Sequence, residues 1–277
     1  MTLATRNPGL VERLEPFLVC YRGHRGHFDL SPLGVTIPEA NLVDPMRMES
    51  ERFLLLLQTL DKLTFGPEGM PMPRWVFYDA AEIPGAIFGF GARPSALPER
   101  VREQLGVRDD ETGLVPFSMY IAIPVSPPEV WFGHNLASLN PTFPDLGLKG
   151  LASITKALGL QVFRCRTQIG ATQWDSDALH IHTRFGPLEL VTAYTPAHSE
   201  AETLTYRFDI TEQKIRCALG DPEASLDVPE PTLEITAGDV AAMQALQQRI
   251  EDGERFCLTG PPRRSGGERR VPVASLD

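Results

Sequence analysis

Residues 147–171, GLKGLASITKALGLQVFRCRTQIGA, combine the two hydrophobic periods on which the fold depends. Up to Gly159 the apolar side chains recur at the spacing of one helix face, and the glycine marks the end of the helix. Residues 163–171 then alternate between apolar and polar types, which is typical of a half-buried strand. We therefore expect a helix over 147–159 that is followed directly by a strand.

Short apolar runs separated by proline and glycine turns surround this segment and favour further strands. The expected strand runs are 75–78, 86–90, 117–125, 130–139, 179–183, 188–194 and 204–208. The resulting prediction is an α+β fold, with a β-rich, barrel-like domain that forms a meander with short helices. A helical N-terminal segment precedes that domain.

The same patterns divide the chain into four parts. Residues 1–69 are expected to be irregular and helical, and residues 70–210 to form the β-rich core domain. Residues 211–258 are expected to be a C-terminal extension with one helix. Residues 259–277 are rich in arginine, glycine and proline and show no apolar periodicity, so they are predicted to be a disordered tail.

Composition limits the class of protein. The 277 residues are 42% hydrophobic, which excludes disorder of the whole chain, and 26 basic against 36 acidic residues give a net charge of −10. This acidic balance argues against binding to nucleic acid or an anionic membrane. Apolar stretches such as Phe53–Leu57 are far shorter than a membrane span. With no secretory signal pattern, we expect a cytoplasmic protein with a small-molecule substrate, and the oligomeric state stays unknown.

The cysteines and one pair of histidines are residue types that can bind metal ions, but the sequence does not favour a metal site at either. The four cysteines lie far apart and form no CxxC pair, so free thiols are expected. His180 and His182 would share one face of a strand, but no further ligand follows at a suitable spacing, so no metal site is predicted. The patch Tyr21–His27 is interpreted as a solvated loop.

Lys156 is the most notable candidate for chemistry. It lies in a stretch with no other charge between Lys149 and Arg164. Burial would lower the pKa of this lysine, and a neutral amine can form a Schiff base with a ketone. A lysine exposed on the helix surface is the alternative.

The order of features over residues 95–198 resembles the acetoacetate decarboxylase-like superfamily. The resemblance rests on Ile123-Pro124-Val125-Ser126, on the segment Gly150–Gly159 and on a hairpin over 176–193. It implies that Lys156 is the Schiff-base amine of a small-molecule enzyme, a carbon-carbon lyase that acts on a keto-acid or related carbonyl without a cofactor. Ala157 replaces the family's second lysine, so whether the chain is an active enzyme stays open. The residues expected to line the substrate pocket are Ser118, His134, Trp174 and Tyr194.

A second segment is similar to GNAT acyltransferases. Leu139-Asn140-Pro141 followed by Gly147-Leu148-Lys149-Gly150-Leu151-Ala152 resembles the strand and pyrophosphate loop of that family. The residues Asp175, Ala178, His182 and Gly186 fall at the spacing of the family's later helix. This alternative implies that coenzyme A binds at Gly147 and Gly150, through backbone N–H groups at a helix start. A non-catalytic ligand-binding barrel is the third interpretation.

Overall fold

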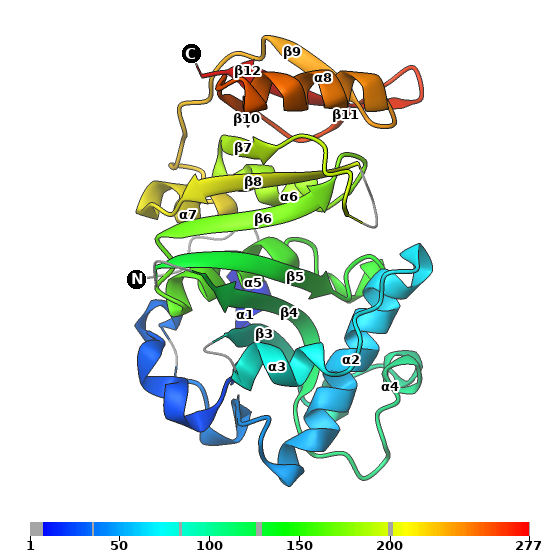
Figure 1. The fold of residues 1–277 in the computed structure, drawn as a ribbon. Coiled ribbons are helices and arrows are strands. Elements are labelled where there is room, and N and C mark those ends of the chain that lie inside the picture. Colours follow the sequence, from blue (N-terminus) through cyan, green and yellow to red (C-terminus); the bar gives the residue numbers. More distant parts are fainter. Residues whose placement is uncertain (1–7, 35, 83–84, 126–128, 199–201, 277) are drawn as a thin grey trace. The chain divides into compact units, whose positions relative to one another are not determined.

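The computed structural model describes residues 8–34, 36–82, 85–125, 129–198 and 202–276 (Figure 1). The chain forms two compact units, unit 1 (Met1–Cys165) and unit 2 (Arg166–Asp277). The boundary between them lies inside the predicted 70–210 domain. It also separates the expected helix and strand of residues 147–171, because the helix belongs to unit 1 and the strand to unit 2.

Unit 1 is built on a mixed sheet whose described strands follow the order β5-β4-β3-β1-β2. Its strands are β1 (Glu15–Val19), β2 (Leu42–Val43), β3 (Ala86–Ala92), β4 (Val115–Pro124) and β5 (Val130–Ser138). Its α-helices are α1 (Pro8–Glu12), α2 (Glu51–Phe65), α3 (Val76–Glu82), α4 (Glu99–Leu105) and α5 (Leu151–Val162). The pairing of β1 with β2 is parallel, and the other described pairs of this unit are antiparallel.

Helices α2 and α5 cover opposite faces of strand β4. On one face, Ser118 forms a hydrogen bond to Thr155 of α5. On the other face, Asn135 of β5 is paired in register with Ile121 and donates a hydrogen bond to Asp61 of α2. Because neighbouring side chains of a strand point to opposite faces, Ser118 and Ile121 place one helix on each side of the sheet. Unit 1 is therefore a three-layer arrangement with its core on both faces of β4.

Unit 2 contains an antiparallel sheet with described strands in the order β11-β12-β10-β7-β8-β6, and β9 pairs with β12 as well. The strands are β6 (Thr167–Gln173), β7 (Leu188–Thr192), β8 (Thr203–Asp209), β9 (Leu233–Thr236), β10 (Phe256–Leu258), β11 (Arg263–Ser265) and β12 (Glu268–Ser275). The helices are α6 (Leu179–His182), α7 (Glu212–Leu219) and α8 (Val240–Glu251). Asp239 caps α8, because its carboxylate accepts the N–H of Ala242.

The α+β class is confirmed, but the barrel is wrong. In each unit the path of described strands runs between two different end strands, β5 and β2 in unit 1 and β11 and β6 in unit 2. The sheets are thus open. Among the described residues, no helix is long and apolar enough to cross a membrane.

The prediction of a disordered tail after Thr259 is also wrong. Residues of the tail form β11 and β12, and β12 pairs with three strands of unit 2. Val271 and Val273 are fully buried. The apolar residues of this strand are too few to show a period amid arginine and proline, so its order comes from pairing with segments distant in sequence.

Two predicted strands are helical instead. Residues 75–78 overlap α3, and residues 179–183 overlap α6. Both runs are too short to distinguish a helix from a strand by periodicity. As a result, His180 and His182 are not on one face of a strand.

Candidate functional site

The loop from β5 to α5 is shaped by two glycines. Gly147 and Gly150 have φ angles of 68° and 94°, a region that side chains other than glycine rarely adopt. Between them Leu148 is buried and Lys149 is exposed. The loop is therefore anchored by one apolar side chain and presents backbone and a lysine to solvent.

Helix α5 begins in this loop without a side-chain cap. Its N-cap residue is Gly150, which has no side chain that could accept a hydrogen bond. The first N–H groups of an α-helix have no partner within the helix, and they lie at the positive end of the helix dipole. The start of α5 can therefore accept an anion.

Two cations lie at the same loop. A Cβ atom added to Gly147 would lie 3.8 Å from the Nη2 atom of Arg13, and Lys149 projects from the loop itself. Both side chains are exposed, and within the described residues neither belongs to an ion pair. Asp145, the one acidic residue of residues 139–150, is paired with Arg100. The charged side chains at the loop that are not in an ion pair are thus both positive.

Lys156 lies one and a half turns further along α5 and has no exposed surface. Burial lowers the pKa of its ammonium well below the ordinary value, and the nearby Cys165 opposes this shift. Burial also raises the pKa of the Cys165 thiol to about 12. Burial therefore favours the neutral form of both groups. The buried amine that a Schiff-base lysine requires is present, but as part of the core.

The other predicted pocket residues are divided between the two units, and Ser118 and His134 belong to unit 1. Ser118 is fully buried, and its Oγ lies 2.6 Å from Thr155 Oγ1, whose own proton is donated to the carbonyl of Leu151. Ser118 therefore donates its hydroxyl proton to Thr155 and joins the sheet to α5. His134 is an exposed residue on β5, although neighbouring protein around its ring desolvates it and lowers its pKa.

Trp174 and Tyr194 belong to unit 2. Trp174 is fully buried and donates its indole N–H to the carbonyl of Ala193 at 2.7 Å. The backbone N–H of Tyr194 is donated to Gln247 of α8. These contacts give Trp174 a structural role in unit 2.

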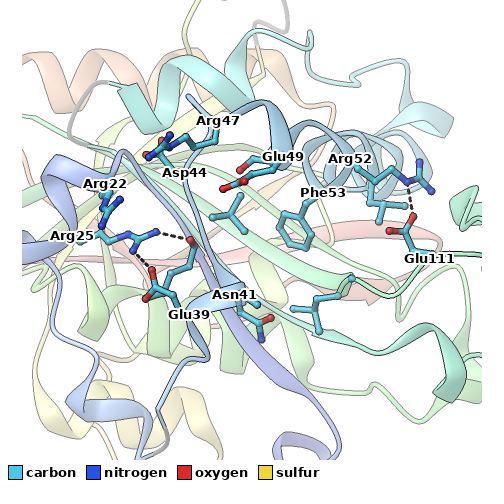
Figure 2. Close-up of a pocket in the computed structure, with 17 residues that line it drawn as sticks. Arg22, Arg25, Glu39, Asn41, Asp44, Arg47, Glu49, Arg52, Phe53 and Glu111 are labelled. Carbon is cyan, nitrogen blue, oxygen red and sulfur yellow. Dashed lines mark hydrogen bonds and ion pairs between the residues drawn. The ribbon is translucent and has the colours of Figure 1, made fainter.

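A pocket of about 460 Å³ in unit 1 was not predicted from the sequence (Figure 2). It is lined mainly by residues 22–25, 39–56 and 111–114, and none of the predicted site residues lines it. Its charged side chains are spread over ninety residues of sequence, so no local motif marks them. The arginines of the patch Tyr21–His27, interpreted above as a solvated loop, are part of its wall.

Comparisons with known proteins give similarity to solved structures only. No family model and no curated protein matches the chain. The similar structures include the NatC complex bound to Gag peptide and CoA, at 13% identity and a TM-score of 0.41, which covers 60% of this chain and 96% of that chain. The ribosomal-protein-S18-alanine N-acetyltransferase from Escherichia coli has 13% identity and a TM-score of 0.38, with 58% and 90% covered. A protein described as a GNAT-family acetyltransferase from Desulfovibrio desulfuricans has 10% identity and a TM-score of 0.37, with 59% and 95% covered.

These findings correct the first interpretation of the sequence. Two of the three structures are of acetyltransferases and the third is of a complex bound to CoA; none of the three is of an acetoacetate decarboxylase. The carbon-carbon lyase with Lys156 as Schiff-base amine is therefore wrong, as is the barrel that accompanied it. The segment around Lys156 gave the wrong function because a helix with one lysine and no other charge is also typical of a helix that is buried for packing alone.

Proposed function

We propose that this protein is a coenzyme A-dependent acyltransferase that holds the coenzyme's pyrophosphate at the Gly147–Gly150 loop. The observation that carries the proposal is the convergence at one loop of two positive-φ glycines, an uncapped helix start and two unpaired cations. Each feature alone is common. Together they suit a ligand with two adjacent phosphate groups.

Each part of the loop has a role in this proposal. The glycines let phosphate oxygens approach the backbone closely, because a Cβ atom added at Gly150 would project into open space where a ligand could lie. The N–H of Leu151 is already donated to the carbonyl of Leu148 at 3.0 Å, so the next N–H groups of α5 donate to the pyrophosphate, and Arg13 and Lys149 balance its charge. The bound thioester would then transfer its acyl group to a nucleophile of the acceptor, with loss of the coenzyme thiol.

Charge reversal at Lys149 tests the proposal without disturbing the backbone. We expect Lys149→Glu to weaken the binding of acetyl-coenzyme A about tenfold or more, because a cation is replaced by an anion beside the phosphates, and tenfold corresponds to about 1.4 kcal/mol. Isothermal titration calorimetry measures the affinity. Lys62→Glu, on the exposed face of α2, is the matched control and should bind as the unmodified protein does.

A glycine variant tests the close approach. Gly150→Glu should abolish binding, whereas Gly106→Glu should not, although Gly106 also has a positive φ of 65° and open space at its Cβ position. A native protein that fails to bind acetyl-coenzyme A, or equal binding by all four variants, would contradict the proposal.

A further inference from the structure

The hairpin of β11 and β12 in unit 2 carries four arginines (Figure 1). Its two strands are joined at residues 266–267, two glycines with φ angles of 60° and 88°, which are typical of a tight hairpin turn. Arg263 is paired in register with Arg270, and Arg264 with Arg269. Residues directly opposite each other share one face of the hairpin, and like charges in such pairs are destabilising. Each face of the hairpin therefore needs carboxylates nearby.

The arginines of β12 have carboxylate partners within unit 2. Arg269 pairs with Asp177 at 2.7 Å, and Arg270 pairs with Glu268 at 2.9 Å and with Glu234 at 4.0 Å. Glu234 belongs to the neighbouring strand β9, where it lies two residues from the register partner of Arg270. It is therefore a diagonal cross-strand neighbour of Arg270 on the same face. A strand beside β12 thus supplies one of the compensating carboxylates.

The arginines of β11 lack such partners. Among the residues that the structure describes, Arg263 and Arg264 are exposed and form no ion pair. Strand β11 ends the strand order of unit 2 and pairs with β12 alone among the described strands. The edge of such a strand presents backbone N–H and C=O groups without partners. Unpaired cations and an open backbone edge therefore coincide on one short strand.

The positions of these two arginines suit an extended peptide. Successive side chains of a strand point to opposite faces, so Arg263 and Arg264 lie on different faces of the hairpin. A strand added beside β11 would present its own successive side chains to the same two faces. Two adjacent acidic residues in that strand would place one carboxylate on each face, and a guanidinium can bind a carboxylate through two N–H groups. The arrangement would repeat on β11 what Glu234 does for Arg270.

We infer that the open edge of β11 binds an extended acidic segment of a partner protein as an additional strand. The arginines also select the partner, because they discourage pairing with strands that lack acidic residues. The phosphates of a nucleic acid would use the arginines but not the backbone edge, and the net charge of −10 disfavours a polyanion. The site is in unit 2 and does not depend on the proposed coenzyme A loop of unit 1.

Peptide probes separate the contributions of charge and backbone. The fluorescein-labelled peptide TVEEVT has two adjacent glutamates among residues that favour strands, TVQQVT lacks the charges, and a third peptide is TVEEVT methylated at every backbone nitrogen. We expect fluorescence anisotropy to show saturable binding of TVEEVT to the full chain. Each of the other two peptides should bind about fivefold more weakly or less tightly still. Absence of TVEEVT binding, or equal binding of either control peptide, would overturn the inference.

Variants locate the binding on β11. Arg263→Gln combined with Arg264→Gln should weaken TVEEVT binding about fivefold or more, and both side chains are exposed, so the fold should persist. Arg22→Gln combined with Arg47→Gln is the matched control, because it also removes two exposed arginines that form no ion pair within the described residues. It should have no effect. Unchanged affinity in the β11 variant overturns the site. Tighter binding of a DNA duplex of about 20 base pairs than of TVEEVT, lost in the same variant, overturns the inference in favour of a nucleic-acid partner.

Discussion

Two lysines lie in very different surroundings, one in the loop before helix α5 and one within the helix. Lys149, in the loop that begins the helix, is exposed beside an uncapped helix start, whereas Lys156, within the helix, has no contact with solvent. Gly150 and Gly159 differ in the same way: a Cβ at Gly150 meets open space, but a Cβ at Gly159 would lie 2.9 Å from the Tyr120 ring. The helix thus has an open start and a tightly packed interior.

The difference shows that surroundings, not residue type, decide what a lysine can do. At the helix start the Lys149 side chain is exposed and can meet an anion. Inside the core, desolvation lowers the pKa of Lys156 and so favours its neutral form. A substitution at one lysine should therefore change ligand binding, and at the other it should change the pH dependence of stability.

The largest expected effect is on that pH dependence. The folded pKa of Lys156 is lowered, so the unfolded chain binds more protons below its ordinary pKa of 10.5, and the free energy of unfolding rises with pH. This contribution amounts to about 1.4 kcal/mol per pH unit wherever Lys156 is neutral in the folded chain and protonated in the unfolded chain. We expect Lys156→Met to lose it, as measured by urea unfolding at several pH values.

The titration of Cys165 limits the pH range in which that experiment can be interpreted. Its thiol pKa is raised to about 12, so its contribution to stability is lost as pH rises above the ordinary thiol pKa of 9.0. Lys62→Met, at an exposed lysine, should keep the slope of the unmodified protein. Identical slopes in all three proteins would show that Lys156 is charged in the folded state.

The second effect concerns the packing of α5 on the sheet. Gly159→Ala should lower the free energy of unfolding by about 1–2 kcal/mol, because the added methyl overlaps the Tyr120 ring while alanine favours the helix. Chemical denaturation measures this change. A stability equal to or above that of the unmodified protein would show that the ring moves freely and that the interior of α5 is not tightly packed.

The smallest effect is the salt dependence of ligand binding at the helix start. Arg13 and Lys149 are exposed, so salt should screen their attraction to phosphates. Raising sodium chloride from 50 to 500 mM should weaken acetyl-coenzyme A binding about threefold, or about 0.6 kcal/mol. Calorimetry at both concentrations, repeated with Lys149→Gln, should show a smaller ratio for the variant. An affinity independent of salt would show that Arg13 and Lys149 do not interact with the phosphates.

Sequence patterns predicted the segments in which local period and burial agree. The helix expected over 147–159 is α5, although it runs from Leu151 to Val162 and continues past Gly159, which was expected to end it. The alternation over 163–171 contains the start of β6. The resemblance to GNAT acyltransferases implies a coenzyme A site at the glycines of the loop, which stays a prediction. The patterns failed for short apolar runs, such as residues 75–78, because four residues are compatible with both the helical and the strand period.

The unpredicted features depend on residues far apart in the chain. The pocket joins residues around 22, 44 and 111, and no short stretch of sequence contains all three. The order of β12 depends on pairing with β9, β10 and β11. Such features arise from tertiary contacts that no local window of sequence contains.

The pairing of β12 also has a consequence for synthesis of the chain on the ribosome. All the strands of unit 1 and six of those of unit 2 are made before β12, but β9 and β10 both pair with it. Until residues 268–275 emerge, the strands β9 and β10 have backbone groups without their native partners. Unpaired strand edges are sites of aggregation, so nascent unit 2 passes through a vulnerable period that ends when β12 emerges.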